Sequence, residues 1–167
     1  MCVSAGSGPC ADPAAGVDVA GVDLSESGIA LARRTHPGVG FEVASVTDNL
    51  TSLFERRFDA VTSLEVVEHL YDPRAYVAAL FDVLEPGGTV IMTTPYHGYL
   101  TNPALAAAGQ LDDHFTVLWD GGHIKFWLRR TLSVLLTEAG FEDVRFRGGG
   151  RLPWLWKSMI LSARKPA

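Results

Sequence analysis

Two short β-branched segments, separated by a helical pattern, constrain the fold of this chain more than any other feature. The first spans Phe58–Ser63, and the second, Gly88–Thr93, follows a Pro86-Gly87-Gly88 turn. Between them, Asp72 and Pro73 predict the start of a helix, because Asp caps helices well and Pro is tolerated at the first helical position. A strand, a helix and a strand in this order predict two parallel strands joined by a crossover helix.

The same alternation of strand and helix patterns extends over most of the chain. Helices are predicted over Ser27–Thr35, with Ser25 as the cap, and over Arg129–Ala139, before Gly140. This alternation predicts an α/β fold built on a parallel sheet. The remaining predicted strands are Met1–Ala5, Asp18–Asp23, Gly40–Val46, Phe141–Phe146 and Ser158–Arg164.

Length, charge and cysteine content narrow the class of protein. A chain of 167 residues with 47% hydrophobic residues fits one globular domain. The net charge of −5, without a basic run, argues against nonspecific nucleic-acid binding. Cys2 and Cys10 give no disulfide framework, and no apolar stretch is long enough to span a membrane. We therefore expect a cytoplasmic protein without a transmembrane segment, and the sequence leaves its oligomeric state open.

Residues 96–125 interrupt the alternation. This segment contains Tyr96, Tyr99, Trp119 and three histidines but no long period. A connection of this length within one domain is usually functional, and it follows a strand whose carboxyl end lies where ligands of open α/β sheets bind. We expect it to cover the site of an acceptor substrate. The alternative is a surface insertion with a helix over Pro103–Leu111.

An acidic residue ends the strand predicted over Asp18–Asp23. A carboxylate at the carboxyl edge of a parallel sheet can accept hydrogen bonds from both ribose hydroxyls of a nucleoside. Asp23 is therefore the first candidate for cofactor binding. Asp23 could also cap the helix that follows, and the two roles are compatible.

Three metal-binding side chains follow the strand Phe58–Ser63. Glu65, Glu68 and His69 are spaced so that a helix would project all three from one face. Carboxylates favour magnesium or manganese, and imidazole favours zinc or iron, so a divalent metal site is one interpretation. The other is that acidic residues simply complement the dipole of a helix in its first turn.

The Glu65-x-x-Glu68-His69 motif and the Pro-Gly-Gly turn before the next strand resemble the class I S-adenosylmethionine-dependent methyltransferases, and most closely the ubiquinone-pathway O-methyltransferases. The resemblance runs from about Gly16 to the C-terminus. It implies one methyltransferase domain over residues 1–167, with a doubly wound, Rossmann-like sheet that is mostly parallel and has an antiparallel last strand at Ser158–Arg164.

The resemblance also implies a role for individual residues. S-adenosylmethionine would be the cofactor, with its ribose at Asp23 and with Leu24 and Leu64 beside it. Relatives with this motif, among them the small-RNA 3′-terminal 2′-O-methyltransferases, have a further histidine downstream. Here that position is His123, which makes Glu65, Glu68, His69 and His123 the implied metal ligands.

The glycine loop departs from the family pattern. Gly6 and Gly8 match two of the family's three glycines, but Ser4 stands in place of its acid and Cys10 in place of its third glycine. Glycines matter there because a turn without Cβ atoms lets the backbone approach the ligand. Two prolines, Pro9 and Pro13, also disfavour the helix that should follow. We expect residues 1–16 to be irregular, the cofactor site to be open on that side, and cofactor binding to be weak.

These observations predict methyl transfer to a hydroxyl of a small aromatic or lipid-like acceptor. A metal would bind the acceptor oxygen, or His69 would act as general base without one. Two alternatives belong to other classes. A degenerate, noncatalytic methyltransferase-like binding module would explain the altered glycine loop. A nucleotide-dependent oxidoreductase on a Rossmann sheet would also place an acid after the second strand.

Overall fold

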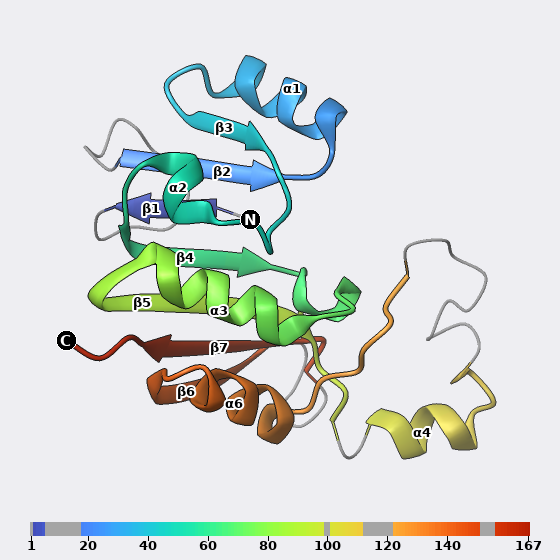
Figure 1. Ribbon diagram of the computed structural model, residues 1–167. Helices are drawn as coiled ribbons and strands as arrows, with labels where there is room; N and C mark the ends of the chain where they lie inside the picture. Colours follow the sequence, from blue (N-terminus) through green and yellow to red (C-terminus); the bar gives the residue numbers. More distant parts are fainter. Residues whose placement is uncertain (1, 6–17, 99–100, 112–121, 151–155) are drawn as a thin grey trace.

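One seven-stranded sheet is the centre of the computed structural model, which describes residues 2–5, 18–98, 101–111, 122–150 and 156–167 (Figure 1). The strand order is β3-β2-β1-β4-β5-β7-β6. The strands are β1 (Cys2–Ala5), β2 (Asp18–Asp23), β3 (Gly40–Val43), β4 (Phe58–Leu64), β5 (Leu84–Pro95), β6 (Glu142–Gly149) and β7 (Ser158–Arg164).

Strand directions confirm most of the expected sheet. β2 and β3 are parallel, as are β4 and β5, and β7 is antiparallel to both of its neighbours. The direction of β1 differs from the expectation, because it runs antiparallel to both β2 and β4. A parallel crossover needs about a dozen residues or more, usually helical, and residues 6–17 contain Pro9 and Pro13. This connection is poorly suited to a parallel crossover helix.

The helices begin where their capping residues predict. Ser25 accepts a hydrogen bond from the Gly28 amide at the start of α1, and Asp72 accepts one from the Ala75 amide at the start of α3. The short helix α2 is capped by Asn49, and the sequence analysis missed it. The helices are α1 (Glu26–Thr35), α2 (Leu50–Phe54), α3 (Pro73–Val83), α4 (Thr101–Ala107), α6 (Arg129–Glu138) and the short 3-10 helix η2 (Val67–His69).

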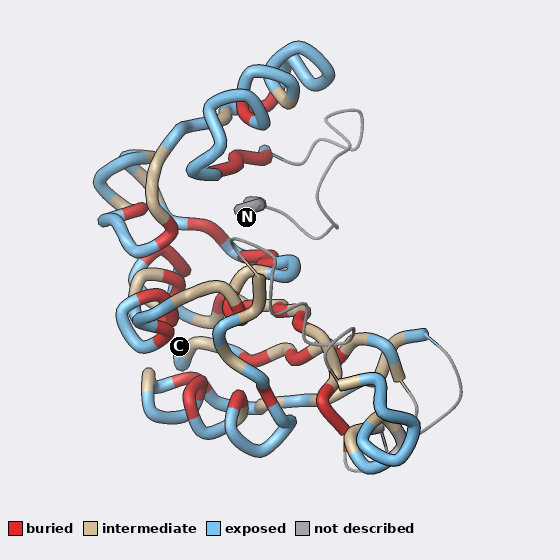
Figure 2. The backbone as a smooth tube through the Cα atoms, turned by 90° about the vertical axis from the view of Figure 1, so that its right-hand side faces the viewer, coloured by how far each residue is buried: buried red, intermediate tan, exposed pale blue. Residues whose placement is uncertain are grey.

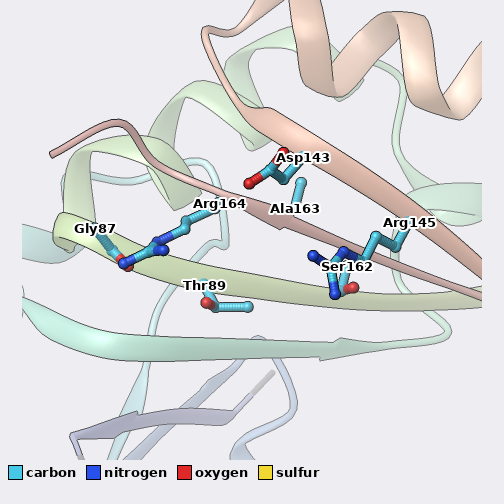
Figure 3. A pocket seen from close by; sticks show the side chains of 7 residues that line it. All are labelled: Gly87, Thr89, Asp143, Arg145, Ser162, Ala163 and Arg164. Carbon is cyan, nitrogen blue, oxygen red and sulfur yellow. The ribbon is translucent and has the colours of Figure 1, made fainter.

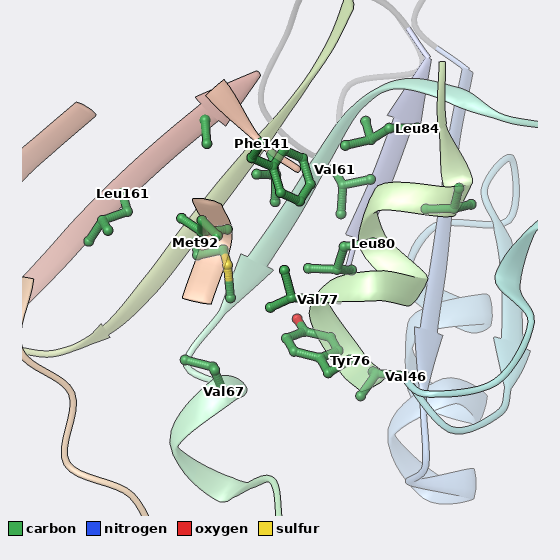
Figure 4. Packing of buried hydrophobic residues seen from close by; sticks show 14 of the residues in the cluster. Val46, Val61, Val67, Tyr76, Val77, Leu80, Leu84, Met92, Phe141 and Leu161 are labelled. Atoms are coloured by element: carbon green, nitrogen blue, oxygen red, sulfur yellow. The ribbon is translucent and has the colours of Figure 1, made fainter. Parts of the chain in front are cut away.

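The main hydrophobic core lies between the sheet and the helices α2, α3 and α6, which lie on the near face of the sheet in Figure 1. Figure 4 shows Val61 and Met92 of the sheet beside Val77 and Leu80 of α3, and all four side chains are buried. Figure 2 shows that α1 and α4 are mostly exposed. The strands beside α3 and α6 are therefore the most firmly held part of the fold.

The carboxyl ends of β2 and β4, both followed by predicted site residues, point to the same edge of the sheet (Figure 1). Leu64, the last residue of β4, pairs with Thr93 of the parallel strand β5. The predicted insertion also starts from this edge, because β5 ends at Pro95. Its predicted helix over Pro103–Leu111 is observed as α4, which begins and ends earlier.

Candidate active site

The segment that follows β4 is not the regular helix that the spacing predicted. Glu65 has a φ of 52°, in the left-handed region, and its amide donates to the Thr93 carbonyl at 3.1 Å. The 3-10 helix η2 begins only at Val67. Glu65, Glu68 and His69 therefore do not share one face of a regular α-helix, which corrects that expectation. The chain turns sharply at Glu65 and carries Glu68 into the interior.

Glu68 is a fully buried carboxylate at the end of the sheet. Its Oε2 accepts a hydrogen bond from Thr94 Oγ1 at 3.0 Å, whereas its Oε1 is buried and has no hydrogen-bond partner among the described residues. Burial raises the pKa of the Glu68 carboxyl above its ordinary value. A buried carboxylate oxygen without a donor is costly, so its presence calls for a functional explanation.

The extended segment 122–128 is held against η2 by backbone hydrogen bonds. The amides of Ile124 and Lys125 donate to the Glu68 carbonyl at 2.9 Å and 3.0 Å. The buried indole of Trp127 donates through Nε1 to the Val67 carbonyl at 3.2 Å. These bonds fix the segment that carries His123 beside the motif after β4, although the two are far apart in sequence.

The two histidine rings meet at this junction. The His69 and His123 ring centres are 5.0 Å apart, and the rings are inclined by 65°. His69 Nδ1 lies 3.3 Å from the Gly122 carbonyl oxygen. Because a carbonyl can only accept, this contact favours the tautomer that carries its proton on Nδ1. A neutral imidazole in this tautomer can bind a metal or accept a proton.

Three of the four implied metal ligands come together here. One ligand atom from each of Glu68, His69 and His123 lies within 4.8 Å of the other two. Glu65 lies outside this group and is exposed. A carboxylate oxygen and two imidazoles are donors that divalent metals accept, so the residues present fit such an ion.

Two buried polar side chains near the motif were missed by the sequence analysis. Thr94 holds Glu68, and the buried Tyr76 hydroxyl of α3 donates to Ser63 Oγ of β4. Burial raises the pKa of Tyr76, so its hydroxyl keeps its proton. Thr94 lies on the same buried side of β5 as Val90 and Met92. A polar residue in this apolar series was the signal that could have indicated the role of Thr94.

The predicted cofactor residues lie at the ends of β2 and β4. Asp23 ends β2, and its Oδ1 accepts a hydrogen bond from the Ser25 amide at 2.8 Å. The helix cap itself is Ser25, so the capping alternative for Asp23 is wrong. Leu24 and Leu64 are 69% and 56% exposed, which is unusual for leucine at a sheet edge and leaves both side chains accessible to a ligand. Gly6 and Gly8 lie outside the described residues.

The amino acid sequence matches the family model described as "Methyltransferase domain" over residues 3–145. The chain belongs to the methyltransferase domain family. Among its relatives are the ubiquinone biosynthesis O-methyltransferases of Dinoroseobacter shibae, 33% identical, and of Thiobacillus denitrificans, 37% identical. The matches cover 87% of this methyltransferase domain in both cases, and 60% and 65% of the two relatives. The chain thus spans less than two thirds of the length of these proteins.

Solved structures support the fold of this methyltransferase domain. The N-methyltransferase NodS from Bradyrhizobium japonicum, in complex with S-adenosyl-L-homocysteine, matches with a TM-score of 0.62 at 16% identity. The match covers 89% of this chain and 66% of that protein. Together with the family match, it confirms a class I, Rossmann-like methyltransferase fold. None of the helices in the described parts of the domain has the length and apolar character needed to span a bilayer.

Proposed function

We propose that this chain transfers the methyl group of S-adenosylmethionine to a hydroxyl of a small aromatic or lipid-like acceptor. The observation that carries the proposal is the convergence of Glu68, His69 and His123 at the carboxyl edge of β4. Ubiquinone biosynthesis O-methyltransferases are relatives at 33% and 37% identity, which favours oxygen as the methylated atom. The reaction takes place in the cytoplasm in this proposal.

The cofactor would bind across the ends of β2 and β4. Asp23 would accept hydrogen bonds from the ribose hydroxyls, since its carboxylate is exposed at the edge of the sheet. Leu24 and Leu64 would contact the apolar parts of the cofactor, and Gly6 and Gly8 would provide the close backbone approach. The methyl donor is already activated by its positive sulfur, so the protein's main task is to align the acceptor.

The acceptor would lie beside the histidine pair. Without a metal, His69 in the tautomer that its contact with Gly122 favours can accept the proton of the attacking hydroxyl through Nε2. Ile124 and Phe126 are 41% and 47% exposed on the segment that carries His123, and they offer an apolar surface to an aromatic or lipid-like substrate. The described remainder of residues 96–125 would cover this substrate, and residues 99–100 and 112–121 of that predicted cover lie outside the described residues.

A divalent metal fits the same residues. Glu68, His69 and His123 would hold it, and the buried Glu68 Oε1 would gain the partner that it lacks. Glu65, the fourth predicted ligand, lies outside this group and would join only after its exposed side chain turned toward the other three. When bound, such an ion lowers the pKa of an acceptor hydroxyl and fixes its orientation. Magnesium or manganese is favoured if both carboxylates bind, and zinc or iron if the histidines dominate.

One observation favours the second candidate function, a noncatalytic methyltransferase-like binding module. β1 ends at Ala5, which pairs with Asp18 at the start of β2 rather than with its end. At about 3.3 Å per residue, Ala5 is therefore about 17 Å from Asp23 along the strand. The chain enters the Gly6–Gly8 stretch from the edge opposite to the proposed cofactor site, which weakens the role of these glycines.

Calorimetry separates the candidates. S-adenosylhomocysteine should bind the purified chain more tightly than NAD, and Asp23→Ala should weaken that binding by about 1.5–3 kcal/mol through the loss of a charge-assisted hydrogen bond. Glu26→Ala, an exposed acid in the first turn of α1, is the matched control and should bind normally. A folded sample that gives no heat with S-adenosylmethionine or its product supports the binding module. Tighter binding of NAD than of S-adenosylhomocysteine would contradict the proposed methyl transfer.

A further inference from the structure

A hollow of about 290 Å³ is lined by residues of β5, β6 and β7 (Figure 3). It opens on the face of β5 and β7 opposite to α3 and α6, since Val90 and Leu161 point into the core while Thr89 and Ser162 are only half-buried. Its lining residues are Gly87, Thr89, Asp143, Arg145, Ser162, Ala163 and Arg164.

Strand pairing brings two arginines and two hydroxyls to this face. Arg145 of β6 pairs with Ser162 of β7, and Arg164 pairs with Thr89 of β5. Arg164 is held in place because its Nε donates to the Gly87 carbonyl at 3.0 Å. Figure 3 shows the Arg164 guanidinium beside Gly87 and the Arg145 side chain beside Ser162, with Thr89 between these two groups in the view.

Neither guanidinium is neutralised by an ion pair within the described residues. The three ion pairs found there involve Arg33, Arg56 and Arg74. Asp143 is the one acid of the lining, and it does not form an ion pair with Arg145 or Arg164 in this part of the chain. The hollow therefore has an excess of positive charge.

The C-terminal part of the chain also carries an excess of positive charge. Residues 122–167 contain nine Lys or Arg and three Asp or Glu, a net charge of +6, whereas the whole chain has a net charge of −5. Residues 1–121 consequently carry −11. Five of the seven lining residues thus belong to the basic part of the sequence of an acidic protein, which favours an anion as the ligand.

We propose that this hollow binds a phosphate group. Guanidinium groups donate paired hydrogen bonds to phosphate oxygens, and the Thr89 and Ser162 hydroxyls supply further donors. The site is separate from the proposed cofactor and metal residues, because Thr89 is about 13 Å from Thr93 along β5 at roughly 3.3 Å per residue. The phosphate belongs either to a free phosphorylated metabolite or to a lipid headgroup.

The test is calorimetry of the full chain with glycerol phosphate, beside cosedimentation with phosphatidylcholine vesicles that contain phosphatidic acid. Arg145→Gln removes one guanidinium, and the Arg145 side chain forms no hydrogen bond within the described residues. The substitution should weaken binding of the phosphate ligand roughly tenfold. Arg34→Gln, the same change at an exposed position on α1, is the matched control and should bind like the wild type. Asp143→Asn should tighten binding, because it removes the opposing charge.

The outcomes are distinct. Binding of glycerol phosphate alone assigns a metabolite, and binding to the acidic vesicles alone assigns a lipid headgroup. Lack of binding to both ligands in a folded sample overturns the proposal. Equal weakening by Arg145→Gln and Arg34→Gln also overturns it, since that result would mean attraction to the overall charge rather than to the hollow.

Discussion

Replacement of Glu68 by Gln should make the metal-free chain more stable. The Glu68 side chain is fully buried, and its Oε1 has no hydrogen-bond partner among the described residues. Such an unpartnered buried group costs about 1–3 kcal/mol, and more when it is charged. The amide removes the charge but introduces a buried NH2 group that offsets part of the gain. We expect a net gain of about 1 kcal/mol, or a Tm higher by about 2–4 °C for a domain of this size.

A divalent metal should make the wild type more stable than Glu68→Gln, the reverse of the order expected without metal. A ligand at 100 times its Kd stabilises the folded state by about 2.7 kcal/mol, which exceeds the expected gain from the substitution. Wild type should therefore melt higher than Glu68→Gln in manganese, and lower in chelator. Thermal unfolding followed by circular dichroism, with and without the ion, measures both. Glu85→Gln, the same change at an exposed position, is the control and should alter neither Tm.

The pH dependence follows from the raised pKa of Glu68. Because the folded carboxyl holds its proton more tightly than the unfolded one, whose pKa is about 4.5, the wild type loses stability as the pH rises from that value through the folded pKa. Glu68→Gln should not show this loss. A variant less stable than wild type in chelator at neutral pH would refute the reasoning from burial. A wild-type Tm that does not respond to metal would remove the metal from the proposal.

Further predictions concern the supports of the fold. Asp18→Asn should lower the free energy of unfolding by at most about 1 kcal/mol at neutral pH, because the ion pair with Arg56 is solvent-exposed. The Arg56 hydrogen bond lowers the pKa of Asp18. In urea unfolding, the stability difference between wild type and variant should therefore disappear as the pH falls from about 3.8 through the folded pKa. Trp127→Phe should cost about 1–3 kcal/mol in urea unfolding through the unpaired Val67 carbonyl. An unchanged stability would show that water replaces the indole.

Local sequence signals predicted the longer helices α1, α3 and α6 and most strands of this fold, but they missed the short helix α2. Ser25 and Asp72 cap α1 and α3 as expected, since a cap needs only a side chain and the amides three residues later. The direction of β1 could not be predicted in the same way. Val3 is equally apolar in a parallel or an antiparallel strand, and only its pairing with Ala20 and Val61 in the folded sheet reveals the direction.

Three of the four metal ligands implied by the sequence lie together in the fold, but the sequence did not indicate their geometry. The family resemblance located His123, whose position beside His69 depends on backbone hydrogen bonds from a distant segment to Glu68. The spacing of the motif suggested a helix face, but the left-handed backbone at Glu65 separates that residue from the others. Thr94 was missed because its contact with Glu68 arises from sheet register, which no local pattern encodes.

The acceptor half and the cofactor half of the proposed active site are built differently, so different substitutions should abolish binding at each. The acceptor half, with Glu68 and His123, is fixed by buried side chains and by backbone hydrogen bonds to η2. The cofactor half consists of exposed side chains, Asp23, Leu24 and Leu64, beside a β1 strand that ends at the opposite edge. Changes in β1, which pairs with both β2 and β4, should therefore affect the cofactor half first. Metal binding should persist in a variant that no longer binds the cofactor. A titration with manganese alone therefore tests the acceptor half independently of methyl transfer.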